Sequence, residues 1–299
     1  MSKLKNKLYY EEIGENNKEL IIFLHSNLLS NWIWEKQRKD FSNYHCIYLD
    51  IPSHGDSYFD NDFSISKSSE IIKDLIEEKR DIGNESFKKV HLVGIALGGQ
   101  IILYLLAKYS NLIDSAVVSG VNLKESYNII NQNDINNILE TLDKLKIDIL
   151  DKKHSDFIIK GYLAEYGIGK DYLDKVRYSI DKLNSNFDDS EHNFDNLNSN
   201  LNIITKESLV FEIPEFGENS KNNENINLLI LYGTKEYPKV AKSAKLIKDS
   251  FHSAKIYSVY RSIHLWNLID YEWFNETIVD FIANKKIDLN DKPYLKKID

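Results

Sequence analysis

The chain has 299 residues but only one cysteine, one methionine and four prolines. Its single cysteine, Cys46, excludes a disulfide bond within the chain. The surrounding run, residues 45–49 (HCIYL), is apolar, so we expect a buried structural thiol. The eight histidines are scattered, with no HxxxH or CxxC spacing, and no dinucleotide fingerprint follows the first expected strand. We therefore expect no metal site and no cofactor.

Long apolar runs are also missing. No stretch of about 18 apolar residues occurs, so the sequence predicts no membrane span. The first residues, MSKLKNKLYYEE, lack the apolar core of a secretory signal, and we expect a cytoplasmic protein. The formal net charge of −8 disfavours nucleic acid or an anionic membrane as the main partner, because phosphates repel an acidic surface. A small-molecule substrate or ligand is the expected partner, and the oligomeric state stays open.

Short apolar runs alternate with helical patterns over residues 1–120. Runs of this kind are typical of strands buried on both faces. The expected strands are residues 20–24, 46–49, 90–94 and 115–119, and the expected helices are residues 32–41, 65–82 and 100–109. Residues 7–14 predict an antiparallel edge strand. This alternation predicts a mostly parallel, doubly wound α/β sheet with crossover helices.

The same pattern resumes near the end of the chain. Strands are expected at residues 228–232 and 255–260, and helices at residues 240–251 and 273–283. Residues 121–225 lie between, with helical patterns at 135–147 and 172–183 and no further strand–helix unit. Apolar side chains there, such as Val176, need burial and favour an ordered cap over a disordered insertion. We predict a core of residues 1–120 and 226–299 with an inserted helical cap, residues 121–225.

Residues 94–99 read Gly-Ile-Ala-Leu-Gly-Gly, between an expected strand and an expected helix. The glycines permit a tight strand-to-helix turn, whose central side chain projects above the sheet. This segment resembles the nucleophile elbow, G-x-S-x-G, of the α/β-hydrolases. Ala96 stands where that family has Ser, Cys or Asp, and a methyl group cannot attack a carbonyl. By the resemblance, the backbone N–H of Leu97 would face an oxyanion.

Two further segments resemble the same family. Residues 23–27 (FLHSN) resemble its His-Gly-x segment, which implies that the backbone of Asn27 supplies the second oxyanion N–H. Residues 48–57 resemble its D-x-P-G-x-G-x-S turn, which is mainly structural, and we do not expect His54 to be catalytic. Ser26 and Ser53 replace glycines of the family pattern.

The expected triad partners follow two late strands. Glu236 falls at the acid position of the segment Gly233-Thr-Lys-Glu236, and His264 lies in the segment His-Leu-Trp-Asn-Leu after the last strand. Their order, nucleophile then acid then histidine, is that of the family. The resemblance covers residues 7–120 and 227–284 and implies the α/β-hydrolase fold, similar to bacterial capped serine esterases. It does not cover the cap.

The resemblance implies a serine hydrolase acting on a carboxylic ester or related acyl bond. Four aromatic residues of the cap, Phe157, Tyr162, Tyr166 and Tyr172, suggest an apolar acyl or aromatic substrate, unless they form the core of the cap itself. As written, the chain should be inactive or severely impaired in acyl-enzyme chemistry, because removal of a triad nucleophile costs about 10⁶ in turnover.

Ala96 leaves several explanations open. In the first explanation, the alanine was introduced in the laboratory into a working hydrolase. Glu236 and His264 are then kept because only one residue was changed. Alternatively, Ala96 is natural and the protein is a pseudoenzyme that binds a small ligand or a protein partner in the former pocket; Ser26 and Ser53 would fit such relaxed constraint. In a third route, His264 activates a water molecule or substrate proton directly, as in lyases and oxygenases of this fold.

Overall fold

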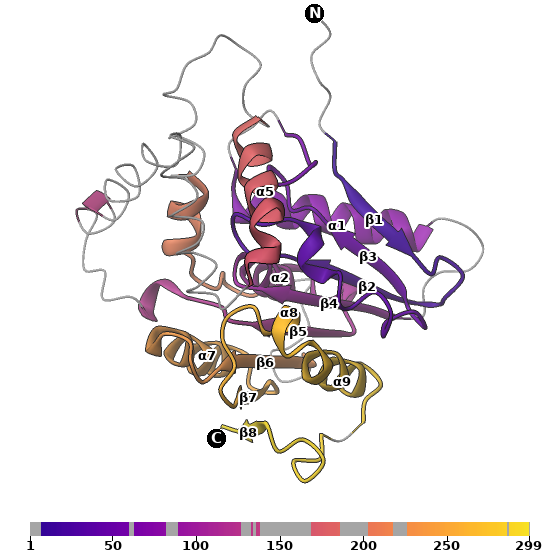
Figure 1. Ribbon diagram of the computed structural model, residues 1–299, viewed down its shortest axis with the longest axis vertical. Helices are drawn as coiled ribbons and strands as arrows, with labels where there is room; N and C mark the ends of the chain where they lie inside the picture. The colour runs from indigo at the N-terminus through magenta and orange to yellow at the C-terminus, as the bar shows by residue number, and fades with distance from the viewer. Residues whose placement is uncertain are drawn as a thin grey trace, which may run out of the picture.

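The computed structural model describes residues 7–59, 63–81, 89–126, 133, 136–137, 169–185, 203–217, 226–285 and 287–298. Within these residues, eight strands form one sheet in the order β1-β3-β2-β4-β5-β6-β7-β8 (Figure 1). The two edge strands, β1 and β8, pair antiparallel and all the others pair parallel. The predicted fold class, a mostly parallel doubly wound α/β sheet, is confirmed.

The strand bounds follow the apolar runs of the sequence. The strands are β1 (Tyr10–Ile13), β2 (Glu19–Leu24), β3 (His45–Leu49), β4 (Lys89–Ile95), β5 (Ser115–Ser119), β6 (Leu228–Gly233), β7 (Lys255–Val259) and β8 (Leu295–Lys297). The inner strands β2 to β6 are buried over most of their length, as continuous apolar runs require. The sequence did not predict β8, a three-residue edge strand with two exposed lysines.

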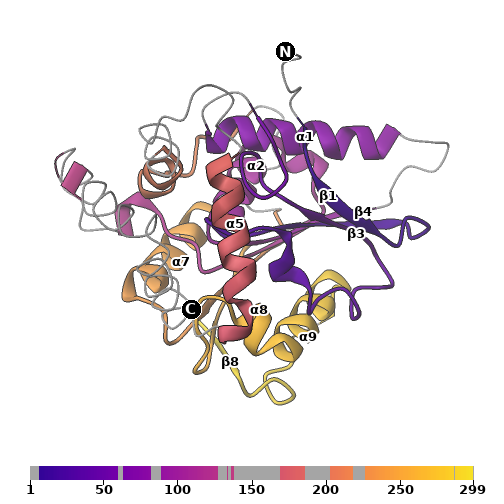
Figure 2. The ribbon, with the colours of Figure 1, turned by 45° about the horizontal axis from the view of Figure 1, so that its top comes forward.

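Helices cover both faces of the sheet (Figure 2). The α-helices are α1 (Ile65–Asp81), α2 (Leu97–Tyr109), α5 (Leu173–Ser185), α7 (Pro238–Ser250), α8 (Trp266–Ile269) and α9 (Tyr271–Ile282). Apolar residues of α1, α2 and α7 share one core layer with alternate residues of the sheet. Apolar residues of α8 and α9 form the second layer with the opposite set. Alternate residues of each buried strand thus serve two cores.

The predicted helix at residues 32–41 is wrong. The structure has a short 3₁₀ helix, η1 (Asn31–Trp34), followed by turns up to residue 43. Tertiary contacts fix this segment: Trp34 is fully buried, and the buried Gln37 donates hydrogen bonds to the Asn267 carbonyl (2.9 Å) and to Asn275 Oδ1 (2.8 Å). These anchors, which come from α8 and α9, override the helical pattern.

The segment predicted as a cap is partly helical where it is described, and residues 210–217 are not helical. Besides α5, residues 203–209 are helical, whereas most of the helix predicted at 135–147 lies outside the described residues. Helix α5 crosses in front of the sheet in Figure 2 and packs on loops that follow β2 and β3. Its Ser179 Oγ accepts a hydrogen bond from Trp32 Nε1 (2.9 Å), and its Tyr178 hydroxyl donates to Asp56 (2.7 Å). Val176 is buried, as the sequence predicts.

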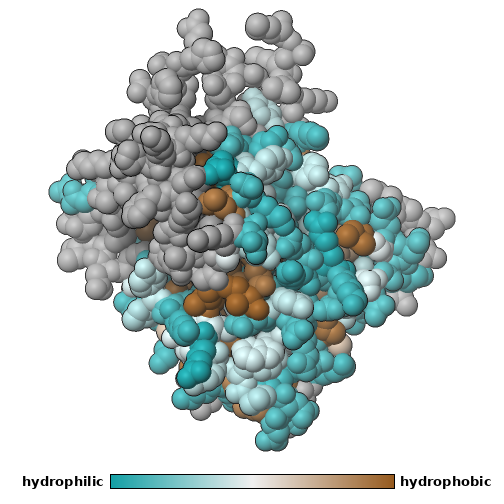
Figure 3. All heavy atoms as spheres, in the orientation of Figure 1, coloured by the Kyte–Doolittle hydropathy of each residue, from teal (hydrophilic) through white to brown (hydrophobic). Residues whose placement is uncertain are grey.

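The structure bears on two expectations from the sequence, the buried thiol and the membrane span. Cys46 is a buried free thiol, and burial raises its pKa to about 12, so it is a structural residue as predicted. No helix in the described ranges is both long and apolar enough to cross a membrane. Hydrophilic residues dominate the coloured surface in Figure 3, with hydrophobic residues gathered in smaller patches near its middle.

The two serines that replace family glycines differ in backbone conformation. Ser53, in the turn after β3, is buried and has φ +67°, in the left-handed region that favours glycine. Ser26, in the loop after β2, is also buried but has a negative φ. Only the first replacement therefore carries backbone strain.

Ser53→Gly is expected to raise the free energy of unfolding, by up to about 1 kcal/mol. The left-handed conformation costs a residue with a Cβ about 1–2 kcal/mol, which glycine would not pay. Glycine loses more conformational entropy on folding, and this loss offsets about 0.5–1 kcal/mol of the gain. Ser26→Gly is the matched control and should lower the same free energy by about 0.5–1 kcal/mol, because it brings the entropy cost without relief of strain. Urea unfolding of both variants measures the two values; equal signs would contradict this account.

Candidate active site

The elbow between β4 and α2 has the strained geometry that its sequence predicts. Ala96 has φ +47° and ψ −109°, a conformation that costs about 1–3 kcal/mol. Its N–H donates to the Ser119 carbonyl at the end of β5 (2.9 Å). The Gly98 N–H donates to the His25 carbonyl (3.1 Å), and a Cβ on Gly98 would lie 2.2 Å from the Leu24 carbonyl oxygen. Glycine is therefore required where α2 starts against the end of β2.

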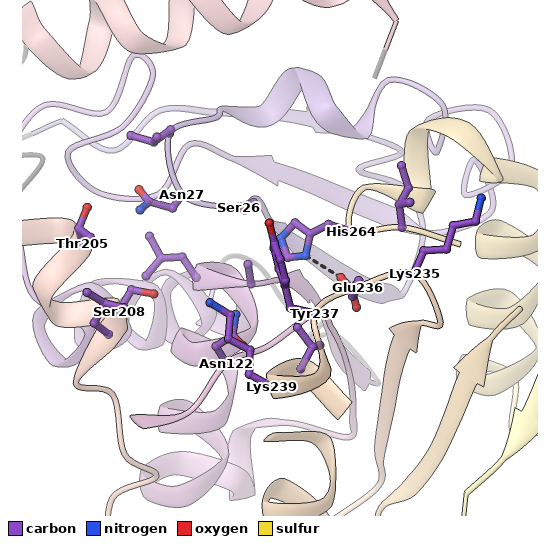
Figure 4. Close-up of a pocket in the computed structure, with 16 residues that line it drawn as sticks. Ser26, Asn27, Asn122, Thr205, Ser208, Lys235, Glu236, Tyr237, Lys239 and His264 are labelled. Atoms are coloured by element: carbon purple, nitrogen blue, oxygen red, sulfur yellow. Dashed lines mark hydrogen bonds and ion pairs between the residues drawn. The ribbon is translucent and has the colours of Figure 1, made fainter. Parts of the chain in front are cut away.

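His264 and Glu236 form a direct pair beside the elbow. His264 Nδ1 lies 2.6 Å from Glu236 Oε1, and the Gly233 N–H donates to the other carboxylate oxygen (3.0 Å). The two side chains are 14% and 4% exposed, respectively. The carboxylate accepts from Nδ1–H, so the neutral ring presents Nε2 as its basic atom. Figure 4 shows the pair at one side of the cavity.

Gly120, directly after β5, makes room for this pair, although no motif in the sequence singles it out. Its φ is +64°, and a Cβ there would lie 2.7 Å from His264 Nδ1 and 2.8 Å from Glu236 Oε1. The sequence feature that could have indicated this role is the position of the glycine, directly after the buried strand β5.

A cavity of about 450 Å³ joins all five predicted site residues: Asn27, Ala96, Leu97, Glu236 and His264. The remaining lining residues are Ser26, Leu28, Asn122, Thr205, Ser208, Leu209, Lys235, Tyr237, Lys239, Val240 and Ile263. Leu97 is the first residue of α2, and Asn27 follows β2. Neither backbone N–H donates a hydrogen bond to another described residue. Both groups can therefore bind an acceptor in the cavity.

Two buried histidines support the loop that carries Asn27. His25 Nδ1 donates to the Ser26 carbonyl (2.7 Å), and its Nε2 accepts from the Ile51 N–H (2.9 Å), which joins the loops after β2 and β3. The His54 ring contacts the Asn27 side chain, with Nε2 3.4 Å from Oδ1. Burial lowers the pKa of His25 well below its usual value and that of His54 to about 4. Both rings are therefore neutral structural groups at pH 7.

The polar wall of the cavity was not expected from the sequence. Asn27 lies on one side of the view in Figure 4, Asn122 and Lys239 on the other, and Ser208 faces the cavity from the helical residues 203–209. Gln100 of α2 joins two of these segments, because its Nε2 donates to the Asn122 carbonyl (2.8 Å) and the Ser208 carbonyl (2.9 Å). These four residues come from four segments that are distant in the sequence, so no local motif marks the wall.

The aromatic residues predicted for substrate recognition have mixed outcomes. Tyr172 does not line the cavity; its ring stacks on Trp32 with centroids 5.5 Å apart, and its hydroxyl donates to Glu35 (2.9 Å). Phe157, Tyr162 and Tyr166 lie outside the described residues. In the described ranges, no three His, Cys, Asp or Glu side chains group as a metal site.

The buried histidines predict a loss of stability in acid. The pKa of His54 is about 4 in the folded chain. Between pH 6.5 and 4 the unfolded chain therefore binds a proton that the folded chain does not, and the free energy of unfolding decreases as the pH is lowered. Asp50 acts in the opposite direction, because burial raises its pKa to about 6 and the folded chain holds that proton more tightly below pH 6. We expect H54Q to lose about 2 kcal/mol less unfolding free energy than the parent between pH 7 and pH 5. Urea titrations at pH 7 and pH 5 measure the unfolding free energies of both chains. An equal decrease in the parent and in H54Q would show that His54 is not buried and neutral.

Comparison with known proteins identifies the family of the chain. The family model described as the alpha/beta hydrolase fold matches residues 19–236. A curated "AB hydrolase superfamily protein" of Gibberella zeae is 33% identical over 81 residues, which are 27% of this chain and 27% of the length of that relative.

Solved structures show the same fold at low identity. MGS-M2, an alpha/beta hydrolase enzyme from a Medee basin deep-sea metagenome library, has a TM-score of 0.68 at 18% identity, covering 96% of this chain and 98% of its own. The bromoperoxidase from Bacillus anthracis has a TM-score of 0.66 at 17% identity, covering 94% and 97%. The enol-lactonase from Burkholderia xenovorans LB400 has a TM-score of 0.64 at 14% identity, covering 93% and 97%. Because the family model spans most of the sequence, this chain belongs to the alpha/beta hydrolase fold family.

Proposed function

We propose that the cavity is the acyl-binding site of a serine-hydrolase-type enzyme in which alanine replaces the nucleophile. The observation that carries the proposal is the convergence of Ala96 with the His264–Glu236 pair, 2.6 Å apart, in one cavity. A paired histidine and carboxylate at a strained strand-to-helix turn is the arrangement that acyl transfer requires. The substrate class is a carboxylic ester or related acyl compound.

The mechanism applies to a serine at position 96. Its hydroxyl would attack the carbonyl, and His264 would take the proton and return it to the leaving group. Glu236 would hold the imidazole in the Nδ1–H tautomer and stabilise its cation. The backbone N–H groups of Asn27 and Leu97 would bind the oxyanion of the tetrahedral intermediate, since both residues line the cavity and neither N–H has an acceptor among the described residues.

With Ala96, the chain binds substrate without forming an acyl-enzyme. The elbow keeps its strained φ of +47° although the methyl group gains nothing from it. Loss of a triad nucleophile leaves about 10³-fold catalysis from the oxyanion donors and binding alone. We therefore propose severe impairment rather than a different reaction.

Residues 121–225 act in this proposal as a cap that closes the site. Two observations support it: Thr205, Ser208 and Leu209 line the cavity, and α5 packs on the loops after β2 and β3. A cap in this place would exclude water and choose the acyl group.

A second candidate is a binding protein without catalysis. What favours it is the open cavity of about 450 Å³ beside Ala96, which can hold a small ligand with no reaction. In this case His264 and Glu236 would serve as hydrogen-bonding groups for the ligand.

Ala96→Ser is expected to restore labelling by a fluorophosphonate probe and to raise aryl ester hydrolysis by at least about 10³-fold over the parent chain. The physical reason is that the added hydroxyl would find the proposed base, His264, and the proposed oxyanion donors, Asn27 and Leu97, already in place. Gel fluorescence and chromogenic ester assays measure the two effects.

Two controls make this test specific. The double variant with His264→Ala should lose both effects, and Glu236→Gln in the serine background should reduce kcat with little change in KM, because it spoils the tautomer of His264. A folded serine variant that neither labels nor hydrolyses any ester would remove support for the hydrolase site and favour the binding protein.

A further inference from the structure

Two residues with side-chain hydroxyls, from the segment predicted as a cap, line the cavity. Thr205 and Ser208 are three positions apart in the helical residues 203–209, so they lie on one face of this turn. Both are half-buried. Figure 4 places them on the side of the cavity away from His264, the side on which Asn27 also lies. This side therefore offers polar groups at a distance from the His264–Glu236 pair.

The helical turn that carries the two hydroxyls is fixed to the α/β core. The backbone carbonyl of Ser208 accepts a hydrogen bond from Gln100 Nε2 (2.9 Å). Glu207 Oε2 accepts from the Ile65 N–H at the start of α1 (3.1 Å). Ile204 of the same turn is fully buried. The turn is thus held by contacts that leave both side-chain hydroxyls unused.

The hydroxyls are available to a ligand. Neither the Thr205 nor the Ser208 hydroxyl makes a hydrogen bond to another residue that the structure describes. Both oxygens remain accessible, unlike the fully buried side-chain oxygens of Gln100 and Asn122. The Asn27 amide contacts His54 Nε2 through one of its two polar atoms (3.4 Å), and its other polar atom has no hydrogen-bond partner within the described ranges.

The charge of the lining limits what can bind there. The ionisable groups of the lining all belong to residues 235–264. The lining residues from segments 26–28 and 205–209 are uncharged; they are Ser26, Asn27, Leu28, Thr205, Ser208 and Leu209. A charged group bound against these residues would lose water without meeting a counter-charge among them, which is costly. A purely apolar group would leave the hydroxyls without hydrogen bonds. A neutral group that both donates and accepts fits this side best.

The position of His264 decides which end of the substrate reaches the two hydroxyls. In acyl transfer the histidine gives its proton to the leaving group, so the leaving group must lie beside His264. Thr205 and Ser208 lie on the far side of the cavity from that ring (Figure 4). The acyl part of the substrate therefore extends toward them.

We infer that the side chains of Asn27, Thr205 and Ser208 form a hydroxyl-binding subsite, so that the substrates of this site are esters of hydroxylated carboxylic acids. The inference rests on the proposed function for the identity of the reacting end. A ligand hydroxyl donates one hydrogen bond and accepts others, and the serine and threonine hydroxyls can rotate to match it. Leu28 and Leu209, which line the same cavity, offer apolar contacts to the methylene groups of the acyl chain.

The test compares two pairs of esters in the Ala96→Ser background: methyl 6-hydroxyhexanoate with methyl hexanoate, and racemic methyl 3-hydroxybutanoate with methyl butanoate. The pairs place the hydroxyl far from and near to the reacting carbonyl. We expect kcat/KM for at least one hydroxylated ester to exceed that of its unsubstituted partner by about 5-fold or more, mostly through KM, because the subsite binds a part of the substrate remote from the reacting bond. Without a subsite the order would be reversed, since the hydroxyl would lose its water.

Three variants in the same background assign the preference to the hydroxyls. The double variant T205V/S208A removes both hydroxyls and should bring the ratio to one or below. Thr205→Ser is the matched control, because it keeps a hydroxyl at the same position and should keep the preference. Lys206→Ala should also keep it, since Lys206 is exposed on the same turn and does not line the cavity. If the double variant does not fold, the single variants T205V and S208A replace it, and at least one of them should lower the ratio.

The outcomes separate this inference from the proposed function. A serine variant that hydrolyses the esters without preferring either hydroxylated one, or a preference that survives loss of the hydroxyls, overturns the subsite and leaves the hydrolase site standing. If the serine variant hydrolyses none of the four esters, the proposed function fails, and calorimetric binding of the same esters to the parent chain with Ala96 decides the subsite. Binding of a hydroxylated ester about 5-fold or more tighter than of its partner, lost in T205V/S208A, supports it; equal or weaker binding overturns it.

Discussion

The close approach of α2 to β2 at Gly98 is the constraint on which the site depends. With 2.2 Å between an ideal Cβ position and the Leu24 carbonyl oxygen, no other residue type fits there without a shift of the backbone. That approach forces the chain to reverse within one residue, and Ala96 takes the strained φ of +47° as a result. The same turn places the N–H of Leu97 beside the loop that carries Asn27. The geometry of an elbow is thus set by packing and persists with a methyl group at its centre.

A second constraint positions the histidine. The Ser119 side chain at the end of β5 accepts a hydrogen bond from Trp266 Nε1 (2.9 Å), which fixes the segment after His264 against the sheet. Gly120 leaves space for the ring and the Glu236 carboxylate, and Gly233 lets β6 end against the Ser262 carbonyl. The carboxyl ends of five strands, β2, β4, β5, β6 and β7, therefore meet at the site, as expected at the carboxyl edge of a parallel sheet.

The described lining of the cavity is mixed in chemistry. Aromatic residues of the predicted cap suggested an apolar substrate, but the one of them that is described, Tyr172, packs outside the cavity against Trp32. The lining instead combines aliphatic residues with Lys239 and Asn122.

The sequence by itself predicted the strands of the sheet except β8, and its resemblance to the α/β-hydrolases pointed to the elbow, Glu236 and His264. These features are local: apolar runs bury strands, glycines permit a tight turn, and the chemistry follows directly after a strand end. It could not predict the 3₁₀ segment at residues 31–34, because Gln37 is fixed by residues more than 200 positions away. Only the tertiary structure decided which residues share a cavity with the triad positions. Asn122 and Lys239 carry no motif; both line the cavity because the loop after β5 lies against α7, where the Leu123 N–H donates to Ser243 Oγ (2.9 Å), and such packing leaves no pattern along the chain.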